Sequence, residues 1–182
     1  LEVIQTEGFD ALRVNHPVME WKTKEKKKVY VQIGWDGRVA PNELVQTFYL
    51  AQQKDQVTQL SRDVDTAVSE LTQLVEGLSE VDKTDLTEIL NDKQDAFKKT
   101  ELNKAIKDLP KLAKGETWPE DSTEAAMLSA KALIAQRDKL KKNLKAAQEQ
   151  LEKDTYATIE ALTEAQVDEV LTAKWITSLM DD

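Results

Sequence analysis

The dominant feature of the sequence is a spacing of apolar residues at alternating steps of three and four, first between residues 50 and 81 and again between residues 126 and 151. This spacing places apolar side chains along one seam of a helix, like the a and d positions of a heptad. The first seam consists of Val57, Leu60, Val64, Ala67, Leu71, Leu74, Leu78 and Val81. The second consists of Ala126, Ala130, Leu133, Arg137, Leu140, Leu144, Ala147 and Leu151. We therefore expect a mainly α fold built on a long antiparallel, coiled-coil-like pair of helices.

Two valines widen the apolar stripe of the first helix. Val68 and Val75 occupy e positions beside the seam, so the stripe is broader than a two-stranded coiled coil needs. A third element should cover this helix, and it comes either from the chain itself or from a partner. Shorter helices predicted around residues 86 to 90 and 102 to 109 are the candidates within the chain. The candidate partner-binding residues are Val68, Val75, Leu71 and Leu144.

Strand character is confined to residues 1–35, where residues 11–14 and 28–33 are short and β-prone. Lysines gather between these two stretches. The candidate DNA-contact residues are Lys22, Lys24, Lys26, Lys27 and Lys28. The alternative is a solvated loop that offsets some of the many acidic residues, and we favour it because lysines without arginine give no bidentate grip on phosphate. We expect residues 1–40 to form an N-terminal segment with short strands and residues 41–182 to form a helical domain.

Turn and capping signals mark where the helices begin. Gly34-Trp35-Asp36-Gly37 predicts a turn, because its glycines can take positive φ and its aspartate can close an Asx-type turn. A helix follows from Asn42. Asp121 with Glu124 predicts the N-cap of the second long helix, which should fray or turn near Tyr156. A capping box at Thr163 and Gln166 predicts a last helix, in which we expect Trp175 to lie in the core.

Arg137 is the one charged residue in the two seams. A charge buried there must be paired, and Asp63 and Glu70 of the first helix are possible partners. The alternative is that its aliphatic stem packs on the seam while the guanidinium reaches solvent.

Composition and charge narrow the function classes. The formal net charge of −9 argues against indiscriminate binding to nucleic acid or to an anionic membrane. The absence of cysteine excludes disulfides and a thiol nucleophile, and it fits a cytoplasmic protein. No apolar run approaches the roughly 20 residues that cross a bilayer. The single histidine, His16, has no nucleophile pattern near it, and the acidic residues are spread along solvated helices. We expect no enzyme activity, metal site or cofactor site in this chain, and we expect it to be a fragment of a longer protein.

Two short stretches carry a family resemblance. The first is Trp35-Asp36-Gly37 followed by Pro41-Asn42-Glu43-Leu44-Val45 and Tyr49. The second is Tyr156, Leu162-Thr163-Glu164-Ala165-Gln166-Val167, Leu171 and Lys174-Trp175-Ile176. In this order, with a helical spacer between them, they resemble the C-terminal region of modification (M) subunits of type I restriction-modification enzymes. The family's Asn-Pro-Pro-aromatic motif does not occur in the sequence, so no catalytic residue carries over.

The resemblance implies an assembly role. The parent subunit would transfer a methyl group from S-adenosylmethionine, bound upstream of this chain, to N6 of adenine in double-stranded DNA. Two such subunits would flank one specificity subunit through helix packing, and a restriction subunit would join them. Residues 1–33 would then belong to the edge of the methyltransferase domain or to a separate segment.

Two other function classes stay open. One is a clamp that contacts DNA through Lys22 to Lys28 and through the lysines of the second long helix, and its binding should weaken steeply with salt. Those helix lysines are Lys131, Lys139, Lys141, Lys142 and Lys145. The other is a coiled-coil scaffold unrelated to restriction, against which a compact monomer in sedimentation would argue.

Overall fold

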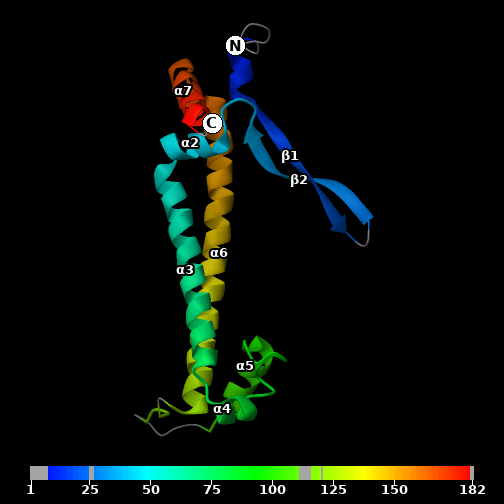
Figure 1. The fold of residues 1–182 in the computed structure, drawn as a ribbon, viewed down its shortest axis with the longest axis vertical. Coiled ribbons are helices and arrows are strands. Elements are labelled where there is room, and N and C mark those ends of the chain that lie inside the picture. Colours follow the sequence, from blue (N-terminus) through cyan, green and yellow to red (C-terminus); the bar gives the residue numbers. More distant parts are fainter. Residues whose placement is uncertain (1–7, 25–26, 111–115, 120, 181–182) are drawn as a thin grey trace. The chain divides into compact units, whose positions relative to one another are not determined.

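The computed structural model describes residues 8–24, 27–110, 116–119 and 121–180, and most of them are helical (Figure 1). The elements in chain order are η1 (Phe9–Arg13), β1 (Asn15–Lys24), β2 (Lys27–Gly37), α2 (Asn42–Tyr49), α3 (Ala51–Glu76), α4 (Glu80–Asp85), α5 (Lys99–Asp108), α6 (Thr123–Ala161) and α7 (Glu164–Met180). The expected mainly α class, with a small β-prone N-terminal segment, is confirmed. Within the described part of the chain, none of the helices combines the length and the apolarity needed to cross a bilayer.

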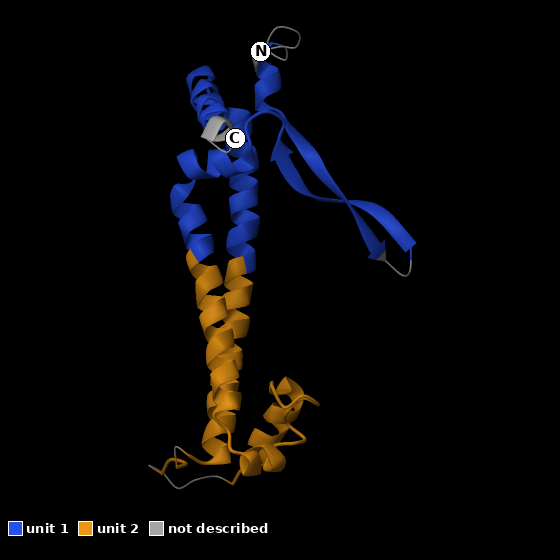
Figure 2. Ribbon diagram, viewed as in Figure 1, with its two compact units in different colours: residues 1–58, 145–182 blue, residues 59–144 orange. Residues whose placement is uncertain are grey.

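The chain divides into two compact units (Figure 2). Unit 1 comprises residues 1–58 and 145–182, and unit 2 comprises residues 59–144. The long helices α3 and α6 each contribute residues to both units. Pairing of these two helices along their whole length stays a prediction.

In unit 1, β1 and β2 form an antiparallel hairpin (Figure 1). Its register pairs Asn15 with Gly37 at the base and Lys24 with Lys27 at the tip, and Ile33 forms a bulge opposite the step from Val18 to Met19. The strand expected at residues 11–14 is wrong, because residues 9–13 form the 3₁₀ turn η1 and bury Leu12. The turn expected at residues 34–37 is also displaced, since these residues lie within β2 and the chain turns after Gly37.

The core of unit 1 joins segments far apart in the sequence. Its buried members are Leu12, Ala40, Val45, Ile159, Leu162, Val167 and Val170. The expected break near Tyr156 is wrong, because α6 continues to Ala161. Thr155 and Ile159 are buried at this end of the helix, and Gln46 Nε2 of α2 donates to Thr155 Oγ1 at 3.1 Å. Tertiary burial therefore holds the last turns of α6 in helical form.

The predicted capping box at the start of α7 is confirmed. Thr163 N donates to Gln166 Oε1 at 2.9 Å, and Gln166 N donates to Thr163 Oγ1 at 3.4 Å. The expectation that Trp175 lies in the core is wrong, since its side chain is 65% exposed. Val167 and Val170 define the buried face, and the next position on that face is Lys174, whose Nζ reaches Val39 O at 3.1 Å.

Unit 2 has a separate apolar core that includes the end of α3 and the start of α6. Its buried members are Val75, Leu86, Ile89, Leu90, Leu102, Met127, Ala130 and Ile134. The residues that follow α4, together with α5, supply the third element, so the chain covers this part of α3 itself. The first long helix ends at Glu76, and Val81 is 70% exposed. Ser122 rather than Asp121 caps α6, because Ala125 N donates to Ser122 Oγ at 3.1 Å.

Candidate docking surface

The structure separates the four candidate partner-binding residues. Val75 is 2% exposed and belongs to the core of unit 2, where Leu71 packs partly buried against the same cluster. Leu144 is half-buried, whereas Val68 is 42% exposed. Of the two e positions, therefore, the chain covers one and leaves the other on the surface.

A shallow groove of about 120 Å³ adjoins Val68 in unit 2. Leu71 of α3, Phe97, and Ile134 and Arg137 of α6 are among the residues that line it. Arg137 Nη2 donates to its neighbour Asp138 at 2.7 Å, so Asp138 takes the role expected of Asp63 or Glu70. Hydrogen bonds from Lys99, and secondly from Arg137, hold the pKa of Asp138 below its usual value. Asp138 thus neutralises the positive charge of Arg137.

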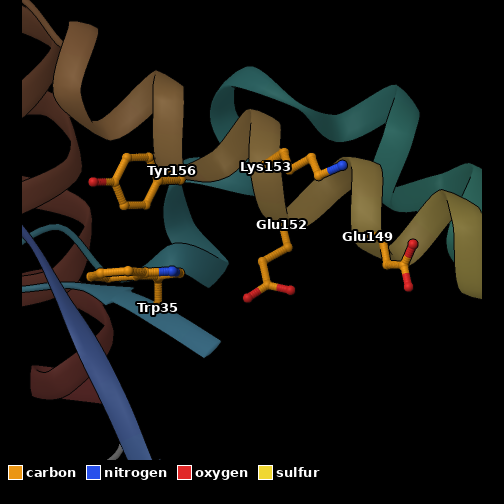
Figure 3. Close-up of a pocket in the computed structure, with 5 residues that line it drawn as sticks. All are labelled: Trp35, Glu149, Glu152, Lys153 and Tyr156. Carbon is orange, nitrogen blue, oxygen red and sulfur yellow. The ribbon is translucent and has the colours of Figure 1, made fainter. Parts of the chain in front are cut away.

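A larger groove of about 400 Å³ lies in unit 1 (Figure 3). Trp35, near the end of β2, forms one wall, and residues of α6 form the rest. The lining residues are Trp35, Glu149, Glu152, Lys153 and Tyr156. Trp35 and Tyr156 both belong to the stretches that carry the family resemblance, but sequence reasoning missed the glutamates because they read as part of a solvated helix face.

A hydrogen-bonded turn fixes the position of Trp35. Asp36 Oδ1 accepts from the backbone N–H of Gly37 at 2.9 Å and of Asn42 at 3.1 Å. The Asn42 side chain returns two bonds, from Nδ2 to Trp35 O at 2.6 Å and from Gly37 N to its Oδ1 at 3.2 Å. The Asx-type closure by Asp36 is therefore confirmed, and it ties the end of β2 to the first turn of α2.

Glycine is required at position 37 because there is no room for a side chain, not because of the backbone conformation. Among the described glycines only Gly8 has a positive φ, so Gly34 and Gly37 do not use the positive φ that glycine permits. A Cβ on Gly37 would lie 1.9 Å from Ala40 O and 3.0 Å from Ile159 Cδ1. The turn closes tightly enough onto α6 that no side chain fits there.

The other wall of the groove is fixed by contacts to the hairpin. The rings of Trp35 and Tyr156 meet edge to face, with centroids 5.2 Å apart and planes at 76°. Asn15 Nδ2 donates to Tyr156 O at 3.2 Å. A hydrogen bond to Glu160, with burial as a secondary cause, raises the pKa of the Tyr156 hydroxyl. The ring contact with Trp35 and the backbone bond from Asn15 hold Tyr156 in place.

Glu152 is the charged residue of the groove that lies nearest to the base of the hairpin; Glu149 and Lys153 also line the groove. Figure 3 shows its carboxylate directed to the same side of α6 as the Trp35 ring. The carboxylate lies against the backbone of Gly34, where an added Cβ would be 3.1 Å from Oε1. No described residue forms an ion pair or hydrogen bond with it, whereas Glu149 lies 3.8 Å from Lys145 Nζ. An aromatic wall beside an unpaired carboxylate suits the side chain of a lysine or arginine.

The candidate DNA-contact lysines that the structure describes lie on the strands of the hairpin rather than in a loop. Lys22 is in β1, and Lys27 and Lys28 begin β2. Lys26 lies outside the described residues, and only the backbone of Lys24 is described. The lysines of the second long helix are exposed along α6. Sequence reasoning missed Trp21 and Tyr30 as candidate contact residues. A signal was present, because the two aromatic residues flank the lysines in the sequence and pair across the hairpin.

The two stretches that carry the resemblance come together in unit 1. The Trp35 to Tyr49 segment supplies the turn and α2, and the Tyr156 to Ile176 segment supplies the end of α6 and α7. They share the core of unit 1, and Tyr49 Oη donates to Glu169 Oε2 at 2.7 Å. No described cluster of acidic or histidine side chains is arranged to hold a metal ion. Comparison of the chain with protein families, with curated proteins and with solved structures found no match.

Proposed function

We propose that this chain is the non-catalytic C-terminal assembly domain of the modification subunit of a type I restriction-modification system. It docks the N6-adenine methyltransferase, whose S-adenosylmethionine site lies upstream, onto the specificity subunit. The complex acts in the cytoplasm on double-stranded DNA, and the restriction subunit joins it there. The proposal takes up the family resemblance of residues 34 to 180.

The observation that carries the proposal is the convergence of the two resembling stretches on one groove. Trp35 and Tyr156 are far apart in the sequence but meet ring to ring, and each is anchored through its backbone. Residues that matter only for a helix seam would not need this arrangement. An exposed aromatic wall held rigid by its own hydrogen bonds is a suitable anchor for a partner protein.

The aromatic and acidic residues of the groove support one kind of contact with the partner. A guanidinium or ammonium group from the specificity subunit stacks on the Trp35 ring and pairs with Glu152. Such a cation–π contact contributes about 0.5–2 kcal/mol, depending on how fully it is desolvated. Val68 on α3 is a separate apolar contact for the partner, in unit 2. Helix packing supplies most of the affinity, and the groove supplies the specificity.

The test measures the affinity of the full chain for the specificity subunit by isothermal titration calorimetry. We expect Trp35→Ala and Glu152→Gln each to weaken binding about tenfold, which corresponds to about 1.4 kcal/mol. Trp21→Ala is the matched control, because it removes an exposed tryptophan at the far end of the hairpin. Circular dichroism establishes that each variant is folded. Failure of the unmodified chain to bind the specificity subunit would refute the proposed function, and unchanged affinity of both groove variants would refute the role of the groove.

A further inference from the structure

The tip half of the hairpin carries a pair of aromatic side chains that are exposed and belong to neither apolar core. Trp21 and Tyr30 lie opposite each other in the register, with ring centroids 4.9 Å apart and planes at 37°. Their side chains are 65% and 54% exposed. A cross-strand aromatic pair stabilises a hairpin by about 0.5–1.5 kcal/mol, and that accounts for their pairing. It does not account for the ring surface left in water.

Lysines lie near this pair on both faces of the hairpin, in a chain whose net charge is negative. Lys28 is opposite Thr23 on the same face of the ribbon as the two rings, because side chains alternate along each strand. Lys22 and Lys27 lie on the other face. Glu20 is the one described acidic residue on the two strands near them, 3.7 Å from Lys22, and so exposed a pair contributes little. With a formal charge of −9 over the whole sequence, this half of the hairpin is a local positive site.

We propose that the hairpin binds single-stranded nucleic acid. Bases stack on the exposed faces of Trp21 and Tyr30, while Lys28, Lys22 and Lys27 contact the phosphates on either side. Aromatic side chains that stack bases beside cations that follow the backbone are the means by which proteins hold single strands without reading sequence. DNA and RNA strands share this chemistry.

The neighbours of the rings favour a single strand over other anionic partners. A duplex keeps its bases stacked on one another and presents no free base face to Trp21. A membrane would require a continuous apolar patch. Met19 shares the face with the two rings, but so do the polar residues Thr23, Lys28 and Gln32, which interrupt it. An unpaired base offers a flat ring and polar edges, and these match both parts of the surface.

The site is independent of the proposed docking function. It uses the tip half of the hairpin, while the docking groove uses the base of the hairpin and α6. Failure of one proposal therefore leaves the other standing.

The test uses the full chain and fluorescence anisotropy with labelled oligothymidylate, oligouridylate and a mixed-sequence duplex, each about 15 nucleotides or base pairs long. We expect both single strands to bind more tightly than the duplex, and a difference between the two strands identifies the source of the ligand. Binding should weaken as salt rises from about 50 to about 200 mM. Vesicles containing phosphatidylserine, assayed by co-sedimentation, test the membrane alternative.

Variants separate stacking from charge. Trp21→Ala should lower the affinity for single strands about tenfold, because stacking on one aromatic side chain contributes that much or more. Trp175→Ala, which removes an equally exposed tryptophan on α7, is the matched control and should change nothing. Lys28→Gln should reduce the slope of log affinity against log salt by about 0.7 without disturbing the hairpin.

Several results would overturn the proposal. They are an absence of binding at low salt, duplex binding as tight as single-strand binding, and equal affinities of the Trp21→Ala and Trp175→Ala variants. Binding to vesicles but not to oligonucleotides would also overturn it.

Discussion

Replacing Gly37 by alanine tests how the base of the hairpin is built. The added Cβ would lie 1.9 Å from the carbonyl oxygen of Ala40, which is a backbone atom and cannot rotate away. It would also lie 3.0 Å from Ile159 Cδ1 in the core of unit 1. Relief of the clash requires the turn between β2 and α2 to open.

The loss of stability in Gly37→Ala follows from the contacts that are broken when this turn opens. Forcing one extra methyl group into a well-packed site costs about 1–3 kcal/mol. The hydrogen bonds from Gly37 N and Asn42 N to Asp36 Oδ1 would lengthen or break, at about 1 kcal/mol each. These costs overlap because they arise from the same movement. We therefore expect Gly37→Ala to lower the free energy of unfolding by about 3 kcal/mol.

Gly34→Ala is the control, because it adds the same methyl group three residues earlier in β2. There the Cβ would meet the Glu152 carboxylate at 3.1 Å, and the free end of a flexible side chain can move aside. Its effect should stay within about 0.5 kcal/mol. Urea unfolding followed by circular dichroism measures both variants, and faster hydrogen exchange in α2 would localise the damage. Equal stability of the two variants would refute the steric explanation.

The remaining predictions concern unit 2, the start of α7 and a tyrosine. Val75→Lys places an uncompensated charge in the core of unit 2 and should lower the free energy of unfolding by about 3 kcal/mol or more. Val68→Lys, at an exposed position, should leave the urea midpoint nearly unchanged. Similar losses of stability in the two variants would contradict the burial of Val75. Thr163→Ala removes the capping oxygen of α7 and should cost about 1 kcal/mol in the same assay, with recovery in Thr163→Ser. Burial, and then the hydrogen bond to Glu169, raises the pKa of Tyr49 from 10.0 to about 12. The neutral hydroxyl therefore stabilises the fold below pH 10, and this contribution is lost as the pH rises toward about 12. Urea midpoints over that range should fall less for Tyr49→Phe than for the unmodified chain, and parallel curves would contradict this.

The helices could be predicted where the buried side chains follow the helical spacing of apolar residues in the sequence. Val64 and Ala67 are buried at the expected seam positions of α3, and the capping box at Thr163 starts α7 where its spacing indicates. These features depend on residues within one or two turns of each other. A periodic pattern therefore contains enough information to place them.

The errors lie where distant contacts decide the outcome. The end of α6 depends on α2, since Gln46 bonds Thr155 from the other end of the chain. Asp138, which pairs with Arg137, is held by Lys99 of α5, a residue far from it in the sequence. No local pattern shows which side chains come together across such separations.

The groove could be predicted only in part. Trp35 and Tyr156 were singled out as motif residues, but the sequence does not show that their rings meet. Glu152 resembles any other exposed helix carboxylate until Gly34 is placed against it. Whether Val68 or Val75 faces outward is likewise decided by α5 and the segment before it, not by heptad position.

The bulge at Ile33 divides the hairpin into a base half and a tip half. Because a bulge bends the strand and sharpens the twist of a ribbon, it sets the direction of the outer half of the hairpin relative to the half that holds Trp35. Deleting this single residue would straighten the ribbon and re-aim the Trp21 end while the Asp36–Asn42 turn stays intact. Insertions and deletions at one position therefore suffice to reorient one surface of the protein and spare the other.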